Sequence, residues 1–568
     1  MPTLASHQAV LQIAFNAARS VADRHRAELM ADPNVIDVQA GYRFTGGWIT
    51  DLPAVVVTVL QKGDPQSLGS QPLPAELDGF PIDIAAATPA EQLRHLSRTG
   101  EETRAATATL PPIEDFLQPG STPAVAEATR SAVGSGTRQY VKPPGLKLES
   151  VGAPISLLCH ASPDAGWPTL RKFLADIRST LTVAMYDFGA RHVFDAIATA
   201  MADADGTFVL NLDRRSNPKR DGELTEEQVV SQFKRKLKGK FVSSTAAVGS
   251  LYPNAYHIKV AVRDGKAFWI SSGNWQGSNQ PAVDAFKLDE SALRQLFSKH
   301  NREWHIVCRH PRLAATFEAY IQYDVAEAER VGTRGVTLPP LPDLSLPIEP
   351  ELETRAAARP VKRFRPRNFV FKTGDRIKVQ PVLTPDNYGS QVVPLILSAR
   401  KKLYFQNQYI KIPKVFPDGD GEPALKELAE ALRDRINAGV DVRIILRNGG
   451  ETRAMLQALQ VFGIPADNIK LLGGCHNKGI VVDKKVVLVS SQNYSADGVR
   501  FNRDAGLIIR HADVASYFAD IFEHDWENRA TQKVIGEAGD MPLVPVVAAR
   551  SAVRAASRKI SWEDFYGD

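Results

Sequence analysis

The sequence of 568 residues predicts an α/β protein with two similar, pseudo-symmetric lobes and a small N-terminal α+β domain. Three observations support this prediction. Strand-like and helix-like segments alternate in both halves of the chain. The stretch Tyr256–Trp275 is repeated without a gap as Cys475–Tyr494. A shorter pattern is repeated after it, as N-R-E from Asn301 and N-R-D from Asn502.

The first part of the chain, residues 1–104, is the predicted α+β domain. Ser6–Met30 has the apolar spacing of an amphipathic helix. Strand and turn signals follow at Val35–Tyr42, Ala54–Leu60 and Pro72–Ile84. This domain carries no motif that indicates chemistry, so its role is left open.

Composition separates the remaining regions. Residues 105–150 are rich in Ala, Thr, Pro, Gly and Ser and predict a linker, and residues 331–361 form a Pro-rich connector. The first lobe is therefore placed at 151–330 and the second at 362–530. Residues 531–568 are a tail, for which we predict a basic helix around Val546–Lys559.

Each lobe shows the same order of elements before its copy of the repeat. The first lobe has a strand, a helix and a strand at Leu181–Phe188, Ala190–Met201 and Phe208–Leu212. The second lobe has them at Lys402–Gln406, Pro423–Asn437 and Val440–Leu446. This agreement favours two lobes of the same architecture.

Six polar residues occupy the same places in the two copies of the repeat. They are His257, Lys259, Asp264, Ser271, Ser272 and Asn274 in the first, and His476, Lys478, Asp483, Ser490, Ser491 and Asn493 in the second. Each histidine lies two residues before its lysine on a predicted strand. Because side chains alternate along a strand, histidine and lysine share a face.

The pattern H-x-K-x4-D-x6-S-S-x-N resembles the HKD motif of the phospholipase D superfamily, in its form with two motifs in one chain. The resemblance covers the chain from about Val151 to about Arg529. It implies two α-β-α sandwich lobes of phospholipase D type whose motifs meet at the lobe interface. It also implies cleavage of a phosphodiester with no metal and no cofactor.

Two histidines and two lysines around one pocket suit cleavage by two successive displacements. One imidazole attacks phosphorus, and the other protonates the leaving alkoxide and then activates water or an alcohol. The resemblance assigns His257 as the nucleophile and His476 as the acid and base, and the symmetry of the repeat leaves the reverse open. The lysines, with Asn274 and Asn493, are expected to hold the phosphoryl oxygens.

The acidic residues of the repeats call for separate interpretations. Asp264 and Asp483 belong to the family's catalytic pattern, but Asp264-Gly265 is typical of a hairpin turn, so a structural role is favoured. Glu303 and Asp504 are better placed to orient a histidine. Asp504 has a shorter side chain than its counterpart, which predicts a weaker contact.

Aromatic residues flank both motifs. Tyr186, Trp275, Tyr409 and Tyr494 are candidates for the walls of a substrate pocket, and packing in the lobe cores is the alternative.

Composition narrows the choice of partner and compartment. The net charge of +5 suits an anionic partner, either phospholipid or nucleic acid. Three scattered cysteines indicate neither a metal site nor a disulfide framework, which favours a reducing compartment. With no long apolar run and no recognisable signal peptide, we expect a cytoplasmic or otherwise soluble monomer without a transmembrane span.

The favoured function is hydrolysis of a phospholipid head-group ester, or its transfer to an alcohol, through a phosphohistidine. A metal-independent nuclease of the same superfamily is the first alternative, because the chemistry does not depend on what the ester joins. An anion-binding module with an inactive site is the second.

Overall fold

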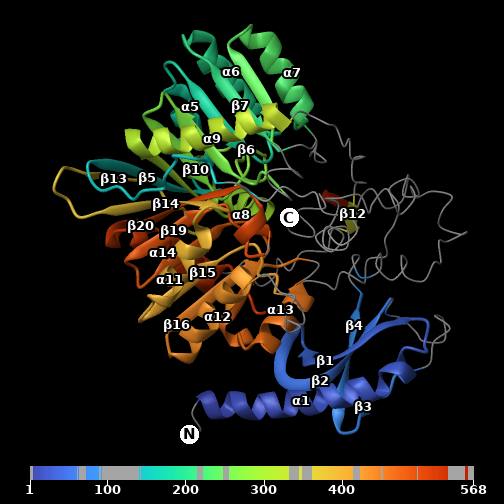
Figure 1. Cartoon of the computed structure of the whole chain (residues 1–568). Coiled ribbons are helices and arrows are strands. Elements are labelled where there is room, and N and C mark those ends of the chain that lie inside the picture. Colours follow the sequence, from blue (N-terminus) through green and yellow to red (C-terminus); the bar gives the residue numbers. More distant parts are fainter. Residues whose placement is uncertain are drawn as a thin grey trace, which may run out of the picture.

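The computed structural model describes residues 4–60, 62, 72–87, 91, 140, 142–213, 222–246, 255–331, 344–347, 361–412, 423–449, 452–495, 497–534 and 557–560. Two mixed β-sheets form the centres of two lobes, which are stacked in Figure 1 with the N-terminal domain beside the second. The predicted α/β fold with two lobes is confirmed.

The first sheet has eight strands in the order β13 (Arg367–Phe371), β5 (Ile155–Ser162), β11 (Glu303–Arg309), β10 (Ala267–Ser271), β9 (Lys259–Arg263), β6 (Leu181–Met185), β7 (Phe208–Leu212), β8 (Phe241–Thr245). Strands β6, β7 and β8 are parallel, and the other neighbours are antiparallel. The helices of this lobe are α5 (Gly166–Ala175), α6 (Arg191–Asp203), α7 (Glu226–Leu237), α8 (Glu290–Lys299) and α9 (Pro311–Val331).

The second sheet repeats this order in seven strands: β14 (Lys378–Thr384), β20 (Asp504–Arg510), β19 (Val486–Ser490), β18 (Lys478–Val482), β15 (Lys402–Gln406), β16 (Asp441–Arg447), β17 (Ile469–Leu472). Its helices are α11 (Tyr388–Leu397), α12 (Pro423–Asn437), α13 (Thr452–Phe462) and α14 (Ala512–Asn528). Taken in their order across the sheet, the seven strands from β5 to β8 correspond one by one to the seven strands from β14 to β17. The two lobes are therefore pseudo-symmetric.

Strand β13 departs from the predicted lobe boundary. It follows the connector, where the sequence places the second lobe, yet it pairs with β5 at the edge of the first sheet. Phe369 and Phe371 on β13 are buried in the core that includes Leu157 of β5. The chain therefore completes the first sheet before it enters the second, and local sequence pattern does not reveal which sheet an edge strand joins.

The two lobes share one hydrophobic core. It combines side chains of both sheets with those of α9 and α14, including Phe317 of α9 and Phe518 of α14. Trp304 of β11 approaches Gly479 of β18 so closely that a Cβ at Gly479 would lie 2.3 Å from the indole ring. The interface thus needs a glycine directly after Lys478, where the first motif has Val260.

The regions that precede, join and follow the lobes are described only in part. Most of the predicted linker 105–150 and connector lies outside the described residues, but Tyr140, Leu146 and Leu148 pack against the shared core. Within the connector, β12 (Leu344–Pro347) pairs with β21 (Ser557–Ile560). The prediction of a helix at Val546–Lys559 is therefore wrong for its last residues, and the rest of it lies outside the described residues. The pairing with a distant strand stabilises an extended backbone there.

The N-terminal domain consists of α1 (Leu4–Leu29) on a sheet of β1 (Val35–Thr45), β2 (Trp48–Val59), β4 (Phe80–Ala86) and β3 (Glu76–Leu77). It docks on α13 of the second lobe. The Gln457 side chain accepts a hydrogen bond from Tyr42 N at 2.8 Å and donates one to Tyr42 O, and Arg453 pairs with Asp83 at 2.7 Å.

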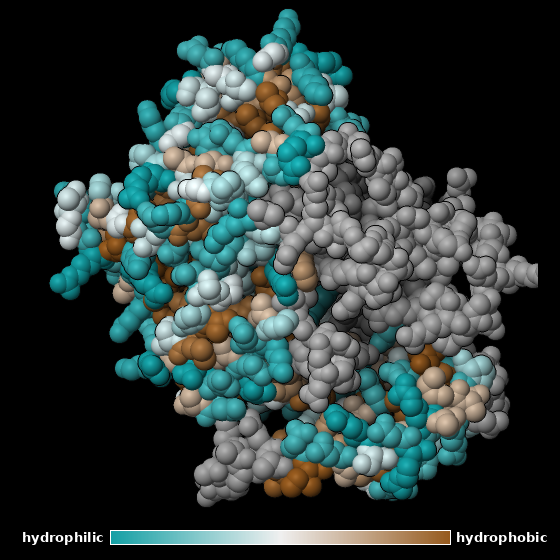
Figure 2. All heavy atoms as spheres, in the orientation of Figure 1, coloured by the Kyte–Doolittle hydropathy of each residue, from teal (hydrophilic) through white to brown (hydrophobic). Residues whose placement is uncertain are grey.

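On the face shown in Figure 2, hydrophilic side chains predominate over both lobes and apolar ones form small separate groups. Among the described residues, no helix is both long and apolar enough to cross a membrane.

We predict that Gln457→Leu loosens the docking of the N-terminal domain, because it leaves the buried N–H and C=O of Tyr42 without partners. The cost is on the order of 1–3 kcal/mol per group. Hydrogen–deuterium exchange of the peptide around Tyr42 should accelerate by at least about 10-fold. Gln295→Leu, at an exposed position of α8, is the matched control and should change exchange around Tyr42 little. Unchanged protection in Gln457→Leu would contradict this account of the docking.

Candidate active site

The two motifs meet at the interface between the lobes. Lys259 is the first residue of β9 and Lys478 the first of β18, and each histidine lies two residues before its lysine. All four side chains are buried, His257 to 3% and His476 to 6% exposure. The structure therefore brings together the four residues that the sequence predicts as one site.

Each histidine is hydrogen-bonded by a carboxylate of the opposite lobe. His257 Nδ1 lies 2.8 Å from Asp504 Oδ1, and His476 Nδ1 lies 2.5 Å from Glu303 Oε1. A carboxylate at Nδ1 holds the proton of a neutral imidazole there and leaves Nε2 with the free lone pair. The predicted orienting role of Glu303 and Asp504 thus acts across the interface.

The second serine of each motif fixes the carboxylate. Ser272 Oγ donates to Glu303 Oε2 at 2.5 Å, and Ser491 Oγ donates to Asp504 Oδ1 at 2.6 Å. Both hydroxyls also accept a backbone N–H from the residue after the carboxylate, at 3.0 Å and 3.1 Å. The second serine of each motif therefore holds in place the carboxylate that binds a histidine.

Two buried ammonium groups dominate the electrostatics. Burial lowers the pKa of Lys478 to about 8, and burial together with the charge of Lys478 lowers the pKa of Lys259 well below its usual value. Lys478 Nζ lies 3.1 Å from His476 Nε2, and Lys259 Nζ donates to His257 O at 2.6 Å. Glu303 and Asp504 oppose both shifts, so the two lysines and the carboxylates that bind the histidines form one buried group of opposite charges.

The two histidines differ in their electrostatic surroundings. Burial, reinforced by Lys259, Lys478 and His476, lowers the pKa of His257 well below its usual value. Burial also lowers the pKa of His476, to about 4, but Glu303 opposes this effect. His257 is therefore the imidazole more firmly held in the neutral form.

The two carboxylates differ as well. Burial raises the pKa of Asp504 to about 7, although Lys259 and Ser491 oppose it. For Glu303, His476 and Lys478 outweigh the effect of burial and hold the pKa at about 2. The change from Glu to Asp in the repeat thus coincides with a weaker stabilisation of negative charge.

The motif asparagines have hydrogen-bonding capacity to offer. Asn274 and Asn493 are at most 5% exposed, and the side-chain oxygen of each has no hydrogen-bond partner among the described residues. A buried amide group with unused capacity costs free energy unless something binds it. The atom without a partner is an acceptor, so contact with a phosphoryl oxygen would have to come from the Nδ2 group of each asparagine.

The aromatic candidates separate into two groups. The Tyr186 ring lies 4.8 Å from the His257 ring and 5.1 Å from Lys259 Nζ, and Lys411 Nζ lies over Tyr409. Trp275 and Tyr494 are fully buried and pack against Phe188 and Phe405. For these two, the alternative of core packing describes their place, because each belongs to a buried hydrophobic cluster of its lobe.

The motif aspartates occupy hairpin turns at the far ends of the motif strands. Asp264 and Asp483 have positive φ values of 53° and 51°. Each carboxylate accepts three backbone N–H groups, at the start of β6 for Asp264 and of β15 for Asp483. Although burial opposes them, these bonds lower the pKa of both carboxyls. The structure places these two residues in the turns, with their carboxylates bound to backbone.

Some residues at the site were missed in the sequence. Asn279 donates to Glu303 and lies 3.2 Å from His476 Nδ1, but it follows the motif and has no counterpart in the second lobe. Arg302 and Arg503 are fully buried and precede the two carboxylates. Their repetition in N-R-E and N-R-D was a signal for them, as was the repetition of S-P-D at Asp164 and T-P-D at Asp386, whose carboxylates bind them.

Comparison with known proteins agrees with this geometry. A family model described as "Cardiolipin synthase, PLD-like domain" matches residues 392–526, which include the second motif and Asp504. Residues 392–526 are thus similar to the phospholipase D-like domains, and they contain the second of the two motifs.

Individual proteins match the chain to different extents. The mitochondrial cardiolipin hydrolases of Mus musculus and Canis lupus familiaris are each 31% identical over 111 residues, which is 18% of this chain. The chain spans 47% and 41% of their lengths, about half or less. The phosphatidylserine synthase of Haemophilus influenzae Rd KW20 has a TM-score of 0.44 at 12% identity, over 68% of this chain and 90% of that one.

Within the described ranges, no group of three or more His, Cys, Asp or Glu side chains is arranged to hold a metal ion. The three cysteines are buried and free.

We predict that Asp264→Ala and Asp483→Ala lower stability but leave the turnover of folded protein nearly unchanged. Each loses hydrogen bonds to three backbone N–H groups, a cost on the order of 2–3 kcal/mol. Because the pKa of these carboxyls is lowered by folding, their contribution is complete at neutral pH and is lost as pH falls below about 4. Thermal unfolding at pH 7 and pH 3, with the turnover at pH 7, tests this. A loss of turnover without a loss of stability would give the aspartates a catalytic role.

Proposed function

We propose that this chain is a phosphodiesterase that cleaves a phospholipid head-group ester through a covalent phosphohistidine. The observation that carries the proposal is the pair of buried histidines, each bound at Nδ1 by a carboxylate of the other lobe, beside two buried lysines. This arrangement supplies two imidazoles, each held at Nδ1, and a positive field for one phosphoryl group.

In the first step, His257 Nε2 attacks phosphorus and the bond from phosphorus to the head-group oxygen breaks. His476, in its protonated form, donates its proton to that oxygen. In the second step, His476 accepts a proton from water or an acceptor alcohol, whose oxygen attacks phosphorus. The P–N bond breaks and His257 is regenerated.

The assignment of roles is supported by the surroundings of the rings. A nucleophile must be neutral, and burial beside two lysines favours neutral His257. The acid must be protonated, and Glu303 favours the charged form of His476. Burial lowers the pKa of His476 to about 4, and the negative charge of a bound phosphodiester would raise it, so substrate binding favours the protonated acid.

The lysines and asparagines stabilise the charge that develops on the phosphoryl oxygens. Lys259 and Lys478 are buried away from water. Electrostatic contacts in such an environment are stronger than at the protein surface. Asn274 and Asn493 would donate from their Nδ2 groups. A phosphoryl group between the lysines would reduce their mutual repulsion.

A lipid substrate is favoured by the proteins that the chain resembles. The matching family model and both curated relatives carry cardiolipin in their names. We therefore propose a glycerophospholipid, with cardiolipin as the first test. Side-by-side assays on cardiolipin vesicles, phosphatidylcholine vesicles, single-stranded DNA and RNA decide the substrate. Turnover of nucleic acid alone would replace the lipid proposal, and anion binding without any turnover would indicate an inactive site.

His257→Ala and His476→Ala are each predicted to lose at least about 1,000-fold in activity while remaining folded, because both rings serve one phosphoryl group. His476→Ala should retain more activity on an ester of p-nitrophenol, which leaves with little help from an acid. It should also accumulate an acid-labile adduct on His257, detected by intact mass at alkaline pH. Half of the activity in either variant would mean two independent sites. An adduct on His476 in His257→Ala would exchange the two roles.

Activity is predicted to survive EDTA, because imidazoles and lysines supply the nucleophile, the acid and the positive charge. The assay uses a soluble short-chain phosphatidyl ester, so that calcium effects on a lipid surface do not enter. Loss of activity on chelation, restored by Mg²⁺ or Zn²⁺, would overturn the mechanism.

A further inference from the structure

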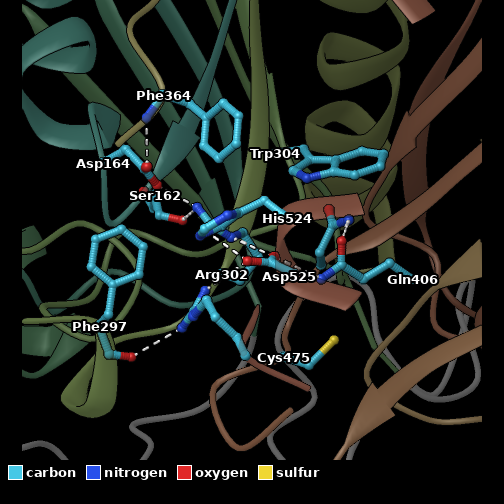
Figure 3. Close-up of polar contacts among 12 residues, drawn as sticks. Ser162, Asp164, Phe297, Arg302, Trp304, Phe364, Gln406, Cys475, His524 and Asp525 are labelled. Atoms are coloured by element: carbon cyan, nitrogen blue, oxygen red, sulfur yellow. Dashed lines mark hydrogen bonds and ion pairs between the residues drawn. The ribbon is translucent and has the colours of Figure 1, made fainter. Parts of the chain in front are cut away.

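Two arginines link the lobes next to the catalytic carboxylates. Arg302, beside Glu303, binds Asp525 of α14 with two bonds, Nε to Oδ2 at 2.8 Å and Nη2 to Oδ1 at 3.1 Å. Its Nη1 binds Asp164 of its own lobe and donates to Ser162 O at 3.0 Å. Figure 3 shows the guanidinium between these two aspartates.

Arg503, beside Asp504, repeats this arrangement in the opposite sense. It binds Asp324 of α9 in the first lobe with two bonds, Nη2 to Oδ1 at 2.8 Å and Nε to Oδ2 at 3.1 Å. Its Nη1 binds Asp386 of its own lobe at 2.6 Å and lies 3.3 Å from Thr384 O. Both arginines are fully buried, so neither pair is a surface ion pair.

The ion pair between Arg503 and Asp324 is connected to His257 through Tyr256. Asp324 Oδ2 accepts the hydroxyl of Tyr256 at 3.0 Å, and Tyr256 is the residue before His257. His257, Asp504, Arg503, Asp324 and Tyr256 thus form a closed ring of contacts that crosses the interface twice. We call it the first circuit.

A second circuit surrounds His476. It passes from His476 to Glu303 and Arg302, and then to Asp525. Gln406 Nε2 lies 3.4 Å from Asp525 Oδ2, and Asn477 Nδ2, beside His476, lies 3.4 Å from Gln406 Oε1. Figure 3 shows Gln406 next to Asp525 on the side away from Asp164. The second circuit is closed by two hydrogen bonds of 3.4 Å, whereas the first is closed by the Tyr256 hydroxyl at 3.0 Å.

Backbone contacts add to both circuits. Arg302 N donates to Gly474 O at 2.7 Å, and Arg503 N donates to Ala255 O at 3.0 Å. Gly474 and Ala255 each lie two residues before a histidine. The segment that carries each carboxylate is therefore attached to the segment that carries its histidine by backbone and by side chain.

We propose that Arg503 and Arg302 are positioning residues for the two half-reactions, Arg503 for attack by His257 and Arg302 for proton transfer by His476. This proposal rests on the proposed function for the assignment of the steps. Loss of one ion pair across the interface displaces one carboxylate relative to its histidine. The reaction step that this histidine carries out, attack for His257 or proton transfer for His476, then becomes slower. A small displacement suffices, because reacting groups must be held to within a fraction of an ångström.

The test compares Asp324→Asn with Asp525→Asn, which remove the same kind of charge from the same kind of bidentate contact. Turnover is measured on phosphatidyl-p-nitrophenol and on phosphatidylethanol, which differ in how much the leaving group needs an acid. Asp324→Asn should lower turnover of both esters by similar factors, about 10–100-fold. Asp525→Asn should lower turnover of phosphatidylethanol at least about 10-fold more than that of the nitrophenyl ester and accumulate the adduct on His257.

Substitutions that remove a single hydrogen-bonding group, and no charge, test the proposal if the aspartate variants fail to fold. Tyr256→Phe opens the first circuit by removing one hydroxyl, and it should repeat the pattern of Asp324→Asn with a smaller loss. Tyr320→Phe is its matched control, since the buried Tyr320 hydroxyl has no hydrogen-bond partner among the described residues. Gln406→Met opens the second circuit and should repeat the pattern of Asp525→Asn.

A readout without turnover separates this proposal from the proposed function. In protein with ¹³C-labelled imidazoles, Asp324→Asn should shift the titration of His257 and leave that of His476 in place, and Asp525→Asn should do the reverse. If both variants shift both histidines, or neither, the circuits do not exist as positioning devices. For Asp525→Asn, equal losses on both esters, in proportion to lost thermal stability, would also overturn the proposal. If the titrations separate but the wild type turns over neither ester, the circuits stand and the proposed function fails.

Discussion

The crossed hydrogen bonds between each histidine and a carboxylate of the other lobe are the constraint on which the site depends. Neither lobe contains a complete set of groups, because His257 needs Asp504 and His476 needs Glu303. The chemistry therefore requires that the lobes be held in one relative position. The shared hydrophobic core, the close approach of Trp304 to Gly479 and the two buried arginines provide that restraint.

Burial of so many charges would be unfavourable if they were isolated, and their arrangement explains how it is tolerated. Each arginine has two aspartates, and each catalytic carboxylate has a histidine and a serine. Lys259 and Lys478 are the exception, since burial lowers the pKa of both. A phosphodiester anion between them would favour their charged forms, which supports the proposed binding of such a substrate.

Duplication gives two equivalent halves, and a few substitutions make them different. Asp504 is shorter than Glu303, Gly479 replaces the valine of the first motif, and Asn279 contacts only the Glu303 side of the site. The consequence is a pair of histidines with unequal surroundings, one held neutral and the other supported by a strongly ionised carboxylate. The proposed double displacement gives the two histidines unlike roles, which need this inequality and which full symmetry would not provide.

The sequence by itself determined the duplicated fold, the four residues of the motif pair and the turn geometry of Asp264, because each follows from local spacing and strand period. It also pointed to Glu303 and Asp504 but not to which histidine each serves. Only the tertiary structure decided that these contacts cross the interface, that β13 completes the first sheet, and that Trp275 and Tyr494 lie in the cores. The physical reason is that period and spacing describe neighbours along one chain segment. Contacts such as Arg503 with Asp324 depend on how two separately formed sheets are packed against each other.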